Sequence, residues 1–128
     1  MSKFSQWLKQ DLPGQRHNAM FGGGFIRGYS LHHERKSIPT KGLTATVQDG
    51  MHVGNYISAK RVLAGGILFG PLGALIGGAA RKNGNQVYVI IEQDDQIIGT
   101  LEAHAKKHRE AHAFVQALTA SANDPDNT

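Results

Sequence analysis

Three histidines spaced four residues apart are the side chains best placed for chemistry in this 128-residue chain. His104, His108 and His112 fall in a segment with helical periodicity, where an i, i+4 pair can present two imidazoles to one zinc or nickel ion. On a helical wheel His104 and His108 share the sector of the apolar residues, and His112 lies at its edge. No carboxylate or cysteine stands at ligand spacing beside them. The pattern favours histidines that pack against a sheet, and we expect no metal ion or other cofactor.

The sequence motifs that signal catalysis are incomplete. GYSLH at 28–32 has the start of a nucleophile elbow, with histidine where the second glycine belongs. GALIGGAA at 73–80 has the spacing of a phosphate-binding loop but ends in two alanines, where a lysine and a hydroxyl residue would hold phosphate and magnesium. Asp94-Asp95 is a carboxylate pair that a hairpin turn explains. We expect no catalytic residues and a protein that is not an enzyme.

Composition narrows the class of protein further. The length predicts one domain with one core. The net charge of +4 is modest and its basic residues are scattered, which argues against a nucleic-acid partner. The chain has no cysteine, and residues 1–12 predict a short amphipathic helix without the apolar region of a signal peptide. These features predict a cytoplasmic protein, peripheral at a membrane if it contacts lipid.

The most unusual segment is an uncharged run of nineteen residues, Val62 to Ala80, with six glycines, four alanines and one proline. Basic pairs flank it, Lys60-Arg61 before and Arg81-Lys82 after. As a straight helix it would reach about 28 Å, barely the hydrocarbon thickness of a bilayer. A single crossing would also place strands of one sheet on opposite sides of the membrane. A transmembrane span is therefore disfavoured, and the segment is treated as an insertion at 65–82.

A hairpin bent near Pro71 is the favoured interpretation of this run. Its larger apolar side chains would dip into a membrane interface. These are Ile67, Leu68, Phe69, Leu72, Leu75 and Ile76. The four flanking cations, Lys60, Arg61, Arg81 and Lys82, would meet anionic headgroups.

Two other interpretations of the same run stay open. The glycine pairs Gly66/Gly70 and Gly73/Gly77 set small residues four apart, a spacing that lets helices approach closely in a homo-oligomer or against a protein partner. Alternatively, the run folds back over the protein's own core. We rank a membrane surface narrowly above a protein partner.

The periodicity of the rest of the chain predicts an antiparallel α+β domain over 18–120. Strands are expected at 25–31 (one or two), 37–39, 42–48, 53–62, 86–93 and 96–101, with Asp49-Gly50 as a hairpin turn before 53–62. From residue 102 to 121 the period becomes helical, with Leu101, Ala111, Phe114, Val115 and Leu118 in one stripe. Residues 121–128 predict a disordered tail.

Four stretches, at 42–50, 57–63, 87–92 and 105–118, together resemble small bacterial and phage proteins with a pleckstrin-homology-like (PH-like) fold. The resemblance covers about residues 25–120. It implies a partly open barrel of about six or seven strands, capped by the C-terminal helix, that acts in binding. Relatives with a short connection lack the insertion at 65–80, so the resemblance implies least about those residues. The expected function is a non-enzymatic binding module.

Overall fold

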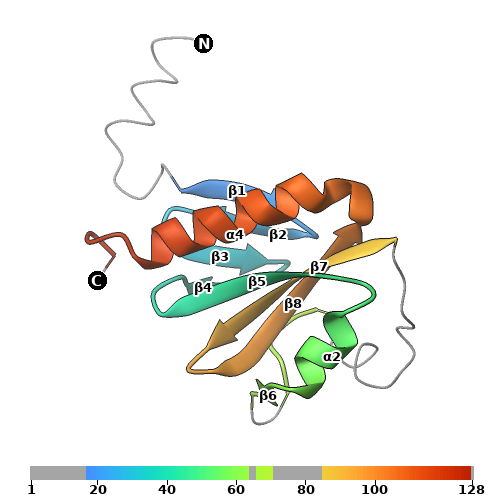
Figure 1. Cartoon of the computed structure of the whole chain (residues 1–128). Helices are drawn as coiled ribbons and strands as arrows, with labels where there is room; N and C mark the ends of the chain where they lie inside the picture. Colours follow the sequence, from blue (N-terminus) through green and yellow to red (C-terminus); the bar gives the residue numbers. More distant parts are fainter. Residues whose placement is uncertain (1–16, 64–65, 71–84, 128) are drawn as a thin grey trace.

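Four short strands form an antiparallel meander in the first third of the chain. The computed structural model describes residues 17–63, 66–70 and 85–127. Neighbouring strands pair in the order β1 (Asn18–Phe21), β2 (Gly24–Arg27), β3 (Ser30–His33) and β4 (Lys36–Pro39) (Figure 1). Positive φ angles at Gly22, Gly23, Gly28 and Glu34 allow the tight turns between them. The region expected to hold one or two strands at 25–31 therefore contributes to two.

A second sheet, built from the middle of the chain, has two long central strands. Its order is β5 (Leu43–Asp49), β7 (Gln86–Gln93), β8 (Gln96–His104) and β6 (Arg61–Val62). β6 runs parallel to β8, and the other pairs are antiparallel. Positive φ at both Asp94 and Asp95 closes the tight β7–β8 hairpin. The strand predicted at 86–93 is confirmed, and β8 continues three residues beyond its predicted end at Leu101.

A helix replaces the strand predicted at 53–62. The Asp49 carboxylate accepts the backbone N–H groups of Met51 and His52, at 2.8 and 2.9 Å, and turns the chain toward α2 (Val53–Ser58). Val53 and Ile57, one helical turn apart, are both buried. Asp49-Gly50 is therefore a helix entry and not a hairpin turn, since β5 already pairs along its length with β7.

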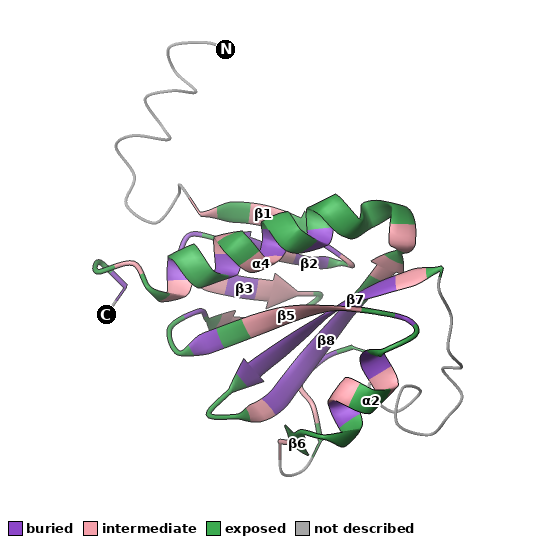
Figure 2. Cartoon of the chain, in the orientation of Figure 1, coloured by how far each residue is buried: buried purple, intermediate pink, exposed green. Residues whose placement is uncertain are grey.

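The main core lies between the two sheets and the C-terminal helix α4 (His108–Ala122) (Figures 1 and 2). Phe114 is fully buried, and its ring lies 6.4 Å from that of Phe21 on β1. Ala111 and Leu118 are also fully buried, as the predicted stripe requires. The helix begins later than residue 102, because Glu102 to His104 belong to β8 and a 3₁₀ turn, η1 (Ala105–Lys107), follows. Leu101 joins the core from β8 and not from the helix.

A second, smaller core covers the opposite face of the β7–β8 hairpin. It is formed by Val53 and Ile57 of α2 with Tyr88, Ile90 and Ile97. Residues Val87 to Glu92 are therefore buried on both faces of β7. The arrangement is α+β, as predicted. The described strands form two sheets without a closed barrel, and there are eight of them, more than the six or seven expected.

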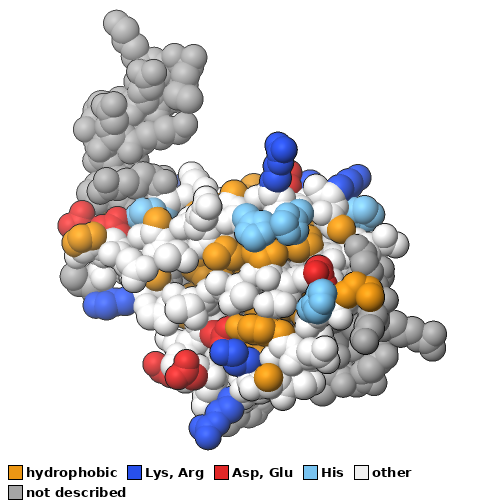
Figure 3. Space-filling view, viewed as in Figure 1, with side chains coloured by type: hydrophobic (Ala, Val, Ile, Leu, Met, Phe, Trp, Pro, Cys, Tyr) orange, Lys and Arg blue, Asp and Glu red, His pale blue; other side chains and the backbone are white. Residues whose placement is uncertain are grey.

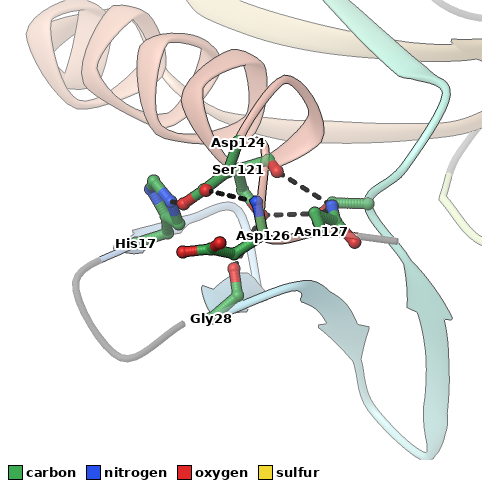
Figure 4. A network of polar contacts seen from close by, with 7 residues as sticks. His17, Gly28, Ser121, Asp124, Asp126 and Asn127 are labelled. Atoms are coloured by element: carbon green, nitrogen blue, oxygen red, sulfur yellow. Dashed lines mark hydrogen bonds and ion pairs between the residues drawn. The ribbon is translucent and has the colours of Figure 1, made fainter. Parts of the chain in front are cut away.

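The structure describes the C-terminal residues up to Asn127, within the stretch 121–128 for which the sequence predicts a disordered tail, and α4 extends to Ala122. The Asn127 side chain, in a residue only 9% exposed, donates to Thr40 Oγ1 at 3.1 Å and to the Ser121 carbonyl at 2.8 Å (Figure 4). Asp124 binds His17 Nε2 at 2.7 Å, which holds the first described residue against the end of α4. A polar, proline-containing stretch can thus bury a side chain where specific hydrogen-bond partners are present. The helix predicted at 1–12 lies outside the described residues.

The hydrogen bonds of this C-terminal network run in one direction. Ser121 Oγ donates to the Gly28 carbonyl at 2.6 Å. With that proton committed, the 2.6 Å contact between Ser121 Oγ and Thr40 Oγ1 requires Thr40 to donate. Thr40 Oγ1 in turn accepts from Asn127. The chain of hydrogen bonds from Asn127 through Thr40 and Ser121 to Gly28 joins the C-terminal residues and α4 to the β2–β3 turn and to the residue after β4, with matched donors and acceptors.

We expect Ser121→Ala to lower the free energy of unfolding by about 1–3 kcal/mol, because the Gly28 carbonyl and the Thr40 hydroxyl both lose a buried partner. Urea denaturation followed by circular dichroism measures this change. The matched control is Ser58→Ala on exposed α2, whose hydroxyl bonds only the Gly54 carbonyl. Equal, small effects of the two substitutions would contradict the role given to the network.

Candidate functional site

The described part of the glycine-rich segment, residues 66–70, runs along the outer edge of β8. Leu63 N–H donates to the Ile97 carbonyl, and Leu68 N–H donates to the Ile98 carbonyl at 2.7 Å. Thr100 N–H then donates to the Phe69 carbonyl at 3.1 Å. The segment therefore extends the β6 side of the second sheet as far as Gly70, the last of these described residues.

Phe69 is the anchor of this stretch. Its ring lies over Gly99, where an added Cβ would stand 2.4 Å from two ring carbons. On its other side the ring stacks on His33 of β3, with centroids 5.2 Å apart and planes 21° from parallel. The ring therefore bridges the two sheets, and only glycine at position 99 leaves room for it. A glycine inside the otherwise apolar strand sequence IIGTL was the signal for this close approach.

The predicted membrane contacts divide into two groups. Phe69 is 8% exposed, and Leu68 packs against the same main core. Ile67 packs against the smaller core. The prediction that these three side chains dip into a membrane is wrong for Phe69, since its burial in the fold leaves it unavailable, and Ile67 and Leu68 are half-buried. Leu72, Leu75 and Ile76 lie outside the described residues.

The two described glycines of the predicted helix-packing pairs, Gly66 and Gly70, do not lie in a helix. Gly66 and Gly70 adopt positive φ angles of 100° and 98°, which end any helix. A Cβ at Gly70 would lie 2.0 Å from the Thr100 carbonyl oxygen. This first glycine pair therefore serves turns and close strand packing and not helix association. Gly73 and Gly77 lie outside the described residues.

The cationic flank is partly engaged within the protein. Lys60 Nζ lies 3.6 Å from Glu92 Oε1 and 5.5 Å from the centroid of the Tyr56 ring. Arg61, at the start of β6, is exposed. Arg81 and Lys82 lie outside the described residues. The Lys60 ammonium group is therefore engaged with Glu92 within the fold and is not a free surface cation.

A polar cluster that the sequence did not suggest surrounds this lysine. Glu92, on β7, is 5% exposed and accepts a 2.5 Å hydrogen bond from the Tyr56 hydroxyl of α2. The Thr46 hydroxyl of β5 lies 3.2 Å from the same Tyr56 oxygen. Burial, and then the hydrogen bond to Glu92, raise the pKa of Tyr56 above its ordinary value of 10.0. Tyr56 thus stays protonated and donates, so the cluster clamps α2 onto the sheet.

A cavity of about 560 Å³ lies beside Leu68, Phe69 and Gly70. Its lining comes from both sheets and the segment: Gly22, His33, Glu34, Lys36, Leu68, Phe69, Gly70, Thr100, Leu101 and Glu102. Lys36 Nζ donates to the Leu68 carbonyl across it. Thr100 Oγ1 is buried and has no hydrogen-bond partner among the described residues. Because carboxylates and cations both line the cavity, its charge selects neither an anion nor a cation.

A smaller cavity of about 260 Å³ lies on the other side of the Gly22–Gly24 turn. It is lined by Met20, which is 76% exposed, together with Phe21, Ala103, Lys107 and Glu110. The turn itself is pressed onto β8, since a Cβ at Gly22 would lie 2.7 Å from the Glu102 carbonyl oxygen. The two cavities therefore flank one tight contact between the sheets.

The histidines of the C-terminal region do not pack against the sheet as predicted. His104, His108 and His112 are all exposed. The buried stripe is set by Ala111, Phe114 and Leu118, and His108 and His112 fall beside it. His104 lies in β8, and its Nδ1 accepts the Lys106 N–H.

Within the described ranges, no three or more acidic or histidine side chains are grouped so that they could share a metal ion. None of the helices described is long and apolar enough to span a membrane. Comparison of the chain with protein-family models, with curated proteins and with solved structures gives no match.

We expect Gly99→Ala to lower the free energy of unfolding by about 1–3 kcal/mol, because the new methyl group displaces the Phe69 ring. Chemical denaturation measures the loss. Gly54→Ala is the matched control: its Cβ would meet no atom within 4 Å, and alanine in a helix interior adds up to about 1 kcal/mol. A neutral Gly99→Ala variant would contradict the placement of Phe69.

Tyr56→Phe should cost about 1.5–3 kcal/mol at neutral pH, because buried Glu92 loses a donor. The folded-state pKa of Tyr56 is raised, so its contribution is complete below pH 10 and is lost as pH rises through that folded pKa. The difference in unfolding free energy between wild type and Tyr56→Phe should therefore shrink in alkaline solution. Burial also raises the pKa of Tyr88, but that residue is common to both proteins and cancels. A pH-independent difference would contradict this account.

Proposed function

We propose that the chain is a non-enzymatic, PH-like binding module that contacts an anionic membrane surface through the segment between Gly70 and Asn85. The larger apolar side chains of that segment are Leu72, Leu75 and Ile76, and its last cations are Arg81 and Lys82. Compared with the sequence-based expectation, the contact moves outward from Ile67, Leu68 and Phe69, which form its base.

The observation that carries this proposal is that both ends of the segment are hydrogen-bonded to the stretch from Thr100 to Ala105, the second half of β8 and the residue after it. Phe69 accepts the Thr100 N–H on one side of the strand, and the Asn85 carbonyl accepts the Ala105 N–H at 2.8 Å just beyond its end. A segment that starts and finishes at one strand begins and ends on the same side of any surface that the protein touches. This supports a contact that enters and returns and argues against a single crossing.

The composition of the segment supports an anionic surface in particular. From Val62 to Gln86 the chain contains no acidic residue, and it closes with two cations. Full burial of a leucine or isoleucine side chain is worth about 1.5–3 kcal/mol, and each cation near an anionic leaflet adds about 1 kcal/mol. Three apolar side chains with Arg61, Arg81 and Lys82 are therefore enough for reversible binding.

Self-association through the same segment is a weaker alternative. Its sequence argument rested on two glycine pairs spaced for helix packing. Gly66 and Gly70 of the first pair instead have positive φ angles, and Gly70 packs directly against Thr100 of β8. The apolar residues that remain would serve a protein partner as well as a lipid surface, and the experiment below separates the two.

We expect the purified protein to float with vesicles that contain phosphatidylserine and to remain unbound with neutral vesicles. Leu72→Ser combined with Leu75→Ser and Ile76→Ser should abolish flotation. These positions are chosen because they lie beyond Phe69, whose replacement would damage the core. The matched control replaces the exposed Met20 and Met51 with serine, which should leave flotation unchanged.

Two double variants test how much the cations contribute to binding of anionic vesicles. Arg81→Gln with Lys82→Gln should weaken binding to anionic vesicles severalfold, whereas Lys106→Gln with Lys107→Gln removes the same charge from η1 and should not. Absence of flotation by the wild type would contradict the membrane proposal. If the wild type then elutes as a larger species than the triple serine variant, the segment binds protein and not lipid.

A further inference from the structure

The first two turns of α4 bring two imidazole nitrogens together on the surface. His108 is the first residue of the helix, and His112 follows one turn later. Their Nε2 atoms are 3.2 Å apart, and the ring centroids are 4.4 Å apart. Both side chains are exposed, and Figure 3 shows histidine side chains gathered over α4, above an apolar strip.

The separation of the two nitrogens matches the bite of a metal chelate. Zinc binds histidine nitrogen at about 2.0–2.1 Å, so two nitrogens 3.2 Å apart subtend about 100° at a shared ion. This angle is close to the tetrahedral value. The two Nε2 atoms are within hydrogen-bond distance, so in a neutral pair one Nε2 carries the proton and the other accepts it. An ion bound to both Nε2 atoms would lie to one side of the line that joins them, and each neutral ring would then carry its proton on Nδ1.

We propose that His108 and His112 form a surface chelate for a borderline transition-metal ion such as Zn²⁺, Ni²⁺ or Cu²⁺. Two coordination positions are filled by the imidazoles, and water fills the rest. The site is separate from the glycine-rich segment, so its existence does not depend on the proposed membrane contact.

The surroundings select against other cations. Lys107 and Arg109 are adjacent in sequence and repel positive ions, so an ion must gain its affinity from bonds to nitrogen. Ca²⁺ and Mg²⁺ prefer oxygen ligands and gain little from imidazole. The order of affinity expected for nitrogen ligands places Cu²⁺ above Ni²⁺ and Zn²⁺.

The helix holds the pair in place before an ion arrives. Ala111 and Phe114, between and just beyond the two histidines, are fully buried and fix α4 against the sheets. Only the two side chains have to adjust. An ion bound to both histidines would tie the first turn of α4 to the second, so it binds the folded state in preference to the unfolded chain.

The test is a calorimetric titration of tag-free protein with ZnCl₂ in a non-chelating buffer. We expect one saturable site per chain and a loss of affinity of at least about tenfold in His112→Gln, the lower end of what loss of even an outer-shell partner costs a metal site. His104→Gln removes a nearby exposed histidine outside the pair and should bind like the wild type. His52→Gln is a second control, because His52 pairs instead with Asp49 at 2.8 Å.

Thermal unfolding supplies an independent readout. Excess Zn²⁺ should raise the melting temperature of the wild type and of His104→Gln but not that of His112→Gln. MgCl₂ at the same concentration should raise none of them. Absence of saturable binding in the wild type would overturn the proposal. So would unchanged affinity in His112→Gln, or a loss of binding in either control variant that equals the loss in His112→Gln.

Discussion

Burial of β7 on both faces is the constraint on which the rest of the structure depends. Its residues from Val87 to Glu92 need apolar cover above and below. On one side the cover comes from α4 and the β1–β4 meander, and on the other from α2. Each burial of a large apolar side chain is worth about 1.5–3 kcal/mol, and β7 alone contributes several such side chains. The short helix α2 and the meander are thus explained as the two covers of one strand.

The partners of the buried polar side chains follow from this arrangement of covers around β7. Glu92 is the last buried residue of β7. Tyr56 of α2 and Lys60, two residues after that helix, approach its carboxylate so that it is not buried alone. Thr40 and Ser121 satisfy each other and the Gly28 carbonyl. In both places a side chain distant in sequence supplies a hydrogen bond to a buried polar group that secondary structure leaves without a partner.

Sequence periodicity predicted the elements that are determined locally. The run QVYVIIEQ and the Asp94-Asp95 turn are found as predicted, because β-branched residues and a tight turn favour one hairpin whatever surrounds it. The region 53–62 was misassigned, because a single i, i+4 pair, Val53 and Ile57, is too short to show a helical period. The histidines were misassigned because the helical stripe was extended back through His104 to Leu101, whereas those two residues belong to β8 and the helix begins only at His108. The burial of Phe69 depends on Gly99 and His33, which only the folded chain brings to it.

The anchoring of Phe69 and Asn85 on either side of β8 has a consequence for the length of the connection between them. The entropy lost when a flexible connection is closed grows only with the logarithm of its length, by about 0.6 kcal/mol for each doubling. The fourteen residues between Gly70 and Asn85 can therefore be lengthened at little thermodynamic cost, provided that the two ends keep their strand contacts. Residues 66–70 have no such freedom, because each step along them changes which side chain meets Gly99. Insertions should accordingly be tolerated after Gly70 and rejected before it.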